Sequence, residues 1–96
     1  MTLKVLESAQ EDLLRGYLFY EEQQPGVGDH FVDTIHAEID SLVLYAGIHP
    51  IRNGHHRVLS STFPFAIYYK LSNAVVTIHA VLDCRQDPRL IEDRLQ

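Results

Sequence analysis

The 96-residue chain has little cysteine, few basic residues and no long apolar run. Cys84 is its only cysteine, which excludes a disulfide within the chain and a thiolate-rich zinc site. Its apolar runs are far shorter than the roughly 20 residues that span a bilayer, and its N-terminus lacks the pattern of a signal peptide. We therefore expect a cytoplasmic protein that makes no membrane contact.

The rest of the composition is that of an ordinary folded domain. Hydrophobic residues make up 46% of the chain and charged residues 22%, both near the averages for globular proteins. A chain of this length can bury one core and not two. Residues 1–96 are therefore predicted to form a single domain.

The two halves of the chain differ in charge. Residues 1–50 hold two basic and nine acidic residues, a net charge of −7, whereas residues 51–96 hold six basic and four acidic residues, a net charge of +2. Neutralising phosphates supplies most of a protein's non-specific affinity for nucleic acid. The overall charge of −5 therefore argues against direct nucleic-acid binding. The simplest interpretation is that the acidic side chains cover the solvated faces of surface helices.

Two amphipathic helices are predicted in the N-terminal half, after a short apolar strand. Ser8 and Glu11 have the spacing of a capping box, which predicts a helix from about Ser8 to Gln23. The segment Pro25–Gly28 is the turn to a second helix, so the two helices form an antiparallel hairpin. The buried face of the first helix is predicted to carry Ala9, Leu13, Tyr17 and Tyr20, widened by Leu14 and Leu18. That of the second helix carries Phe31, Ile35, Ile39, Leu42 and Ala46.

The C-terminal half is predicted to form strands. Apolar and polar residues alternate over Phe65–Leu71 and Val75–Leu82, and a shorter strand begins near His55. Asp87 and Pro88 have the pattern of an N-cap and first residue of a terminal helix. The prediction is an α+β fold in which an antiparallel sheet packs against the N-terminal helical hairpin. Its order is β-α-α-β-β-β with a short C-terminal helix.

The register of the last two strands decides which side chains are accessible. A two-residue turn at positions 72 and 73 would place Leu71 opposite Ala74 and Tyr69 opposite Val76. Tyr69 then faces the core, and Tyr68 lies on the open face of the sheet. This open face is the candidate working surface.

Six histidines raise the question of a metal site. His55 and His56 are adjacent, and adjacent side chains of a strand point to opposite faces. His30 and His36 are six positions apart on a helix, which does not place them on one face. We expect neither a metal site nor a cofactor.

Three motifs together give the chain a family resemblance. They are Phe63-Pro64-Phe65 before a strand, Tyr68-Tyr69 within it, and Arg85-Gln86-Asp87-Pro88 before the last helix. With the helical hairpin, they make the chain resemble the ParE/RelE toxins of type II toxin–antitoxin pairs, and in particular the ParE-like branch. The resemblance extends over nearly the whole chain.

The resemblance implies a growth-inhibiting toxin and a cognate antitoxin as its partner. ParE-like members poison DNA gyrase through protein contacts, whereas RelE-like members cleave messenger RNA in the ribosomal A site. The RelE-like branch is strongly basic and often carries a histidine where this chain has Asp83. The acidic charge of this chain favours the gyrase target. A RelE-like ribonuclease and a degenerate, non-toxic binding module are the alternatives.

The resemblance and the residue types together define candidate sites. RNA cleavage requires a general base, a general acid and cations near the phosphate. Arg57, Tyr68, His79 and Arg85 would supply these groups if the chain were a ribonuclease, although a lone strand histidine is more often a surface residue. For the favoured, non-enzymatic function we expect no catalytic residue. The target-binding residues are then Tyr68, Arg85, Arg89 and Arg94.

The arginines also have a structural interpretation. Arg57 and Arg85 would pair with Asp83 and Asp87 to anchor the last helix, and Arg89 and Arg94 would be solvated. The functional interpretation makes the arginines a basic edge that faces the target or an acidic antitoxin segment.

Overall fold

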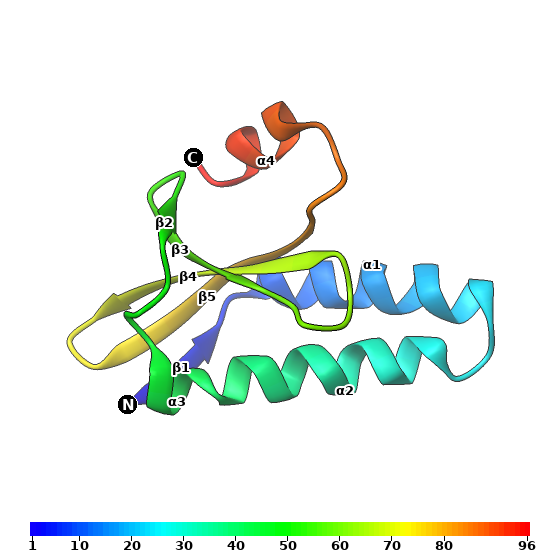
Figure 1. The fold of residues 1–96 in the computed structure, drawn as a ribbon, viewed down its shortest axis with the longest axis horizontal. Coiled ribbons are helices and arrows are strands. Elements are labelled where there is room, and N and C mark those ends of the chain that lie inside the picture. The colour runs from blue at the N-terminus through cyan, green and yellow to red at the C-terminus, as the bar shows by residue number, and fades with distance from the viewer.

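The computed structural model describes all 96 residues. The elements in chain order are β1 (Thr2–Val5), α1 (Glu7–Gln23), α2 (Val27–Asp40), α3 (Leu42–Tyr45), β2 (Ile51–Arg52), β3 (His55–Leu59), β4 (Phe65–Ser72), β5 (Val75–Asp83) and α4 (Pro88–Arg94). Figure 1 shows the hairpin of α1 and α2 on one side of the sheet and α4 on the other. The predicted α+β fold is confirmed, although the short elements α3 and β2 were not predicted and the sheet is not wholly antiparallel. β1 pairs in parallel with β5, so the five-stranded sheet is mixed, with strand order β1-β5-β4-β3-β2.

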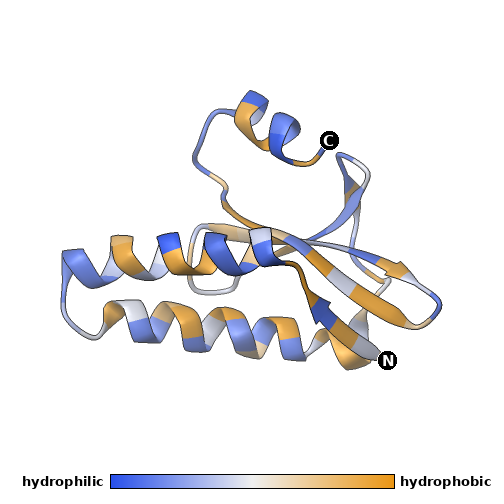
Figure 2. Cartoon of the chain, turned by 180° about the vertical axis from the view of Figure 1, so that it is seen from behind, coloured by the Kyte–Doolittle hydropathy of each residue, from blue (hydrophilic) through white to orange (hydrophobic).

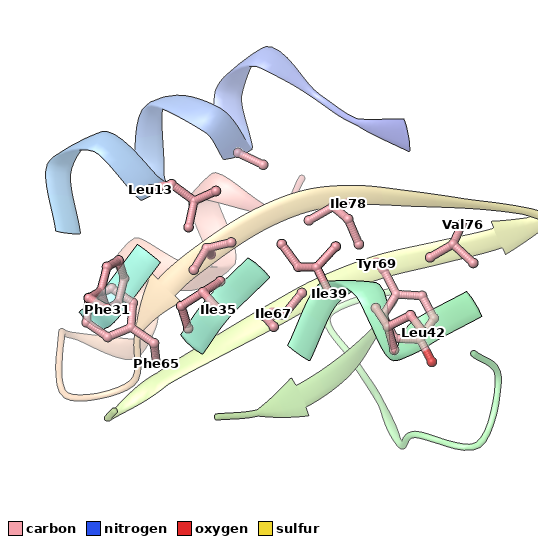
Figure 3. Packing of buried hydrophobic residues seen from close by; sticks show 12 residues of the cluster. Leu13, Phe31, Ile35, Ile39, Leu42, Phe65, Ile67, Tyr69, Val76 and Ile78 are labelled. Carbon is pink, nitrogen blue, oxygen red and sulfur yellow. The ribbon is translucent and has the colours of Figure 1, made fainter. Parts of the chain in front are cut away.

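The main core lies between the helical hairpin and the sheet. Phe31, Ile35 and Ile39 of α2 are buried against Ile67 and Ile78 of the central strands, as Figure 3 shows. This packing confirms the predicted face of the second helix. Figure 2 shows hydrophobic and hydrophilic residues alternating along α1 and α2, as expected for helices that bury only one side.

The first helix differs from its prediction at two places. It begins at Glu7 with Leu6 as N-cap and no side-chain cap, so the predicted capping box does not form. The Ser8 hydroxyl instead donates to the carbonyl oxygen of His79, 3.4 Å away. Leu14 and Leu18 are exposed and do not widen the buried stripe.

The predicted register of β4 and β5 is wrong. Leu71 lies opposite Val76 rather than Ala74, because Asn73 and Ala74 form the turn with positive φ angles. A β-bulge then interrupts the pairing beside Tyr68 and Tyr69. One extra residue in β5 reverses the facing of every residue after it.

The bulge exchanges residues between the two faces of the sheet. Val81 joins the main core, whereas Ala80 and Leu82 turn to the face under α4. There they form a second, smaller core with Ala66, Tyr68 and Leu95. The face predicted to be open is therefore partly closed.

Candidate interaction surface

A buried ion pair attaches α4 to α1. The side chain of Asp12 is only 3% exposed, and Arg94 donates to both of its oxygens at 2.6 and 2.7 Å. The backbone N–H of Val81 and the guanidinium of Arg15 complete its hydrogen bonds at 3.0 and 2.7 Å. Hydrogen bonding to Asp12 raises the pKa of Arg94. The expectation that Arg94 is solvated is wrong, and Asp12 is not part of a solvated acidic face.

Tyr68 lies beneath α4 and is not available to a target. It is 2% exposed and belongs to the smaller core together with Leu95, the residue after α4, and Ile91 of α4 packs against this core. Burial raises the pKa of its hydroxyl, and the neighbouring Arg57 opposes this shift. The prediction that Tyr68 lies on an open face is therefore wrong, because α4 folds back over that face.

The turn before α4 and the first turn of that helix carry two exposed arginine–aspartate pairs. Arg85 donates to Asp83 at 2.8 and 3.0 Å, and Arg89 donates to Asp87 at 2.9 Å. Asp87 also accepts from the backbone N–H of Arg89, which confirms it as the N-cap of α4. These bonds lower the pKa of both carboxyl groups. Arg57 forms no ion pair, so the predicted anchoring set is correct only for Arg85 with Asp83.

A cleft lies beside these arginines, between α1, the end of the sheet and α4. It has a volume of about 390 Å³. Its floor includes the buried residues Phe65 and Leu82, and its walls include the exposed side chains of Phe19 and Leu90. Sequence reasoning missed this cleft. Its walls come from α1 and α4, which lie more than 60 residues apart in the sequence and are joined by the hydrogen bonds of Arg94 to Asp12 and to the carbonyl oxygen of Ser8.

A second groove of about 390 Å³ runs between α1 and α2 on the outer side of the hairpin. Leu13, Leu14, Tyr17 and Val32 supply most of its apolar lining. Leu14, which is exposed and lies outside the core, lines this groove. The molecule therefore presents two apolar recesses, one on each side of α1.

The four candidate catalytic residues do not gather at one open site. Arg57 lies opposite Tyr68, which is buried. Arg85 is held by Asp83 beyond the end of β5, and His79 lies at the bulge beside His55, with ring centroids 4.8 Å apart. None of the three main clefts is lined by more than one of these residues.

The histidine rings pack against other rings and do not gather around a common point where a metal ion could bind. His56 stacks on Tyr69, while His55 packs against His79 on the opposite face, as adjacent strand residues must. His49 Nδ1 lies 2.6 Å from the Tyr69 hydroxyl oxygen, and burial lowers the pKa of His49. No group of three or more His, Cys, Asp or Glu side chains is placed to hold a metal ion. Every helix is too short or too polar to cross a membrane.

No protein-family model matches the sequence, and no curated protein matches it. The fold, in contrast, is similar to that of a chain in a solved structure described as "Chromosomal ParDE TA system from P. aeruginosa". The two chains share 21% sequence identity, and their superposition has a TM-score of 0.74. It covers 84% of this chain and 92% of the other.

Proposed function

We propose that the chain is the toxin of a type II toxin–antitoxin pair, that it inhibits growth by binding DNA gyrase, and that a cognate antitoxin neutralises it. The observation that carries the proposal is the likeness of fold, over 84% of the chain, to a chain of a ParDE system. The Phe-Pro-Phe, Tyr-Tyr and Arg-x-Asp-Pro motifs, which have the same order in ParE-like toxins, support it independently of that superposition.

An antitoxin partner is consistent with the two apolar recesses. A neutralising partner binds tightly by burying apolar surface, and amphipathic segments do so by inserting side chains into hydrophobic grooves. Leu14, Phe19 and Leu90 are exposed apolar residues in or beside the recesses. They are the residues that such a segment would cover.

A gyrase target fits the side chains better than RNA does. A ribonuclease would need Arg57, Tyr68, His79 and Arg85 around one phosphate, whereas Tyr68 is buried and the others lie at separate places on the sheet. The net charge of −5 also disfavours binding to the ribosome's RNA. We therefore propose a protein–protein inhibitor rather than an enzyme.

The proposed target-binding residues are Arg85 and Arg89. Arg85 is exposed on the turn that leads into α4 and Arg89 is exposed in the first turn of that helix, next to the cleft lined by Leu90. Tyr68 and Arg94 are removed from the set predicted from the sequence, because one is buried and the other holds α4 in place.

Controlled expression in bacteria tests the proposal. Inducing the chain alone should arrest growth, and co-expressing the small reading frame that neighbours its gene should restore growth. The Ile35→Ala variant serves as an unfolded control, because truncating this buried residue costs about 2–5 kcal/mol. Normal growth despite soluble, folded protein would contradict the toxin and favour a non-toxic binding module.

The nuclease alternative has its own test. In a reconstituted translation reaction the messenger RNA should remain intact when the chain is added. Site-specific cuts that disappear with His79→Ala would show that the chain is a ribonuclease instead.

A further inference from the structure

A row of five residues, four of them basic, crosses the sheet on the side that faces α4. Residues paired directly across strands point to the same face. Arg52 pairs with His55, and continuing the register of β3 and β4 by one residue places Lys70 opposite His55. Lys70 pairs with Thr77, which pairs with Lys4 of β1. The row spans all five strands and contains no carboxylate.

The centre of this row is hollowed into a polar pocket of about 270 Å³. His55, Lys70 and His79 form its sheet side, and Leu95 is the only hydrophobic residue in its lining. The β-bulge places the ring of His79 against that of His55, which is 5% exposed. The remaining lining comes from Ser8 of α1 and from the end of α4 and the residues that follow it, namely Arg94 and Gln96.

Lys70 supplies the pocket with an unpaired positive charge. Arg94 is neutralised by Asp12, whereas Lys70 takes part in none of the four ion pairs of the chain. His55 uses Nδ1 to bond the carbonyl oxygen of Asn53 at 2.9 Å, which directs Nε2 elsewhere. Burial, and then the proximity of His55 and Lys70, lowers the pKa of His79. An anion in the pocket would oppose the effect of His55 and Lys70 on the pKa of His79.

We infer that this pocket, formed by His55, Lys70 and His79 beneath the end of α4, binds a phosphate group, either as inorganic phosphate or as a small phosphate monoester. Donor side chains converge on it from different strands, which suits the three or four oxygens of a tetrahedral anion better than the two of a carboxylate. Its volume is sufficient for one such group with bound water.

The neighbouring part of the face is closed to a nucleic-acid strand. Ile91 of α4 and Leu95, which follows the helix, cover Tyr68 and Ala80, which form the next row of the sheet. A polynucleotide in the pocket could therefore not continue over that row without displacing α4. A discrete anion needs no such rearrangement.

Binding should depend on pH in a defined direction. An anion favours the charged form of a nearby histidine, so binding must raise the pKa of His79 and must tighten as pH falls. Sulfate is a suitable probe because it keeps both of its negative charges between pH 6 and pH 8. The charged and titratable groups at the pocket are His55, Lys70, His79, Arg94 with its partner Asp12, and the α-carboxylate of Gln96. Lys4 and Arg52 flank the pocket in the row.

Nuclear magnetic resonance of the histidine rings tests the inference. Sulfate and inorganic phosphate, titrated at constant ionic strength against chloride, should shift the His55 and His79 resonances in a saturable way, with tighter sulfate binding at pH 6 than at pH 8. Lys70→Gln should weaken binding about tenfold or more, because it removes a charge-assisted hydrogen bond. Arg89→Gln, which removes the same charge from the exposed turn, should bind like the parent.

Three ligands then distinguish the sources of the phosphate group. Inorganic phosphate and uridine 5′-monophosphate should both bind, whereas a single-stranded oligonucleotide without terminal phosphates should not. Binding of the oligonucleotide alone would overturn the inference, as would unchanged histidine resonances or equal loss in Lys70→Gln and Arg89→Gln. The test does not depend on toxicity, so its outcome is separate from that of the proposed function.

Discussion

At the scale of single residues, the Asp12–Arg94 pair attaches α4 to α1. Removing one partner of a buried pair leaves an uncompensated charge. Because Arg94 is 28% exposed, we expect Arg94→Ala to lower the free energy of unfolding by about 2–3 kcal/mol, below the full value for a buried pair. Urea denaturation measures this difference.

Arg89→Ala is the matched control, because the Arg89 side chain is 85% exposed on the same helix. It should change stability by no more than about 0.5 kcal/mol. Equal effects of the two substitutions would contradict the structural role of Arg94.

A second residue-scale prediction concerns acid stability. The pKa of His79 is lowered in the folded protein, so the unfolded chain binds more protons as pH falls below about 6.5. Stability should therefore decrease from pH 7.5 to pH 5.5, and His79→Asn should reduce that decrease. His49 shifts in the same direction, so some pH dependence should remain.

Thermal unfolding across this pH range makes the comparison, with His36→Asn as an exposed control. A pH dependence that is the same in the parent and in His79→Asn would show that burial of His79 does not affect stability.

The residue-scale roles were only partly predictable from the sequence. The role of Asp87 as an N-cap depends on its immediate neighbours in the sequence, so the local sequence pattern was enough to predict it. The partner of Arg94 is 82 residues away, and Tyr68 is buried by a helix that follows it by about 20 residues. Both depend on the path of the chain after β5, which no local pattern specifies.

At the scale of elements, α1 and α2 approach so closely that a glycine is required between them. A Cβ atom added to Gly16 would lie 2.4 Å from Cε2 of Phe31. Alanine normally favours a helix by about 1 kcal/mol over glycine, but overpacking costs about 1–3 kcal/mol. We expect Gly16→Ala to destabilise the protein in denaturant unfolding.

A double substitution tests the cause. Phe31→Leu should lower the free energy of unfolding less in the Gly16→Ala background than in the parent, because the smaller leucine side chain relieves the clash with the added methyl group. Strictly additive effects would mean that the two residues do not clash.

Helix and strand positions were predictable because periodicity and stop signals are local. The end of α1 at Gln23 and the strands β3, β4 and β5 all follow from such patterns. The bulge in β5 could not be predicted in this way, because the residues before and after it show the alternation of one continuous strand. This single extra residue moved Ala80 and Leu82 to the other face and thereby changed the candidate site.

At the scale of the whole molecule, charge separates two surfaces. The turn before α4 and the first turn of that helix present Arg85 and Arg89, whereas α1 and α2 carry exposed acids such as Glu22 and Asp33. Reversing both arginines to glutamate should weaken target inhibition about tenfold or more, since charged anchors at an interface contribute more than about 1 kcal/mol each. Antitoxin binding, measured by calorimetry, shows whether the variant remains folded.

Reversal of Glu22 and Asp33 to lysine is the control, because both side chains are exposed and form no hydrogen bond or ion pair. If reversing Glu22 and Asp33 abolished inhibition, and reversing Arg85 and Arg89 did not, the target would bind the acidic helices and not the arginines.

We propose that the chain inhibits gyrase through protein contacts. The direct measurement is DNA supercoiling and cleavage by purified gyrase in the presence of the purified, folded chain. The account predicts inhibition of supercoiling with accumulation of cleaved DNA, both reversed by the antitoxin. Unimpaired supercoiling at a large molar excess of folded chain, with growth arrest still observed in cells, would contradict it.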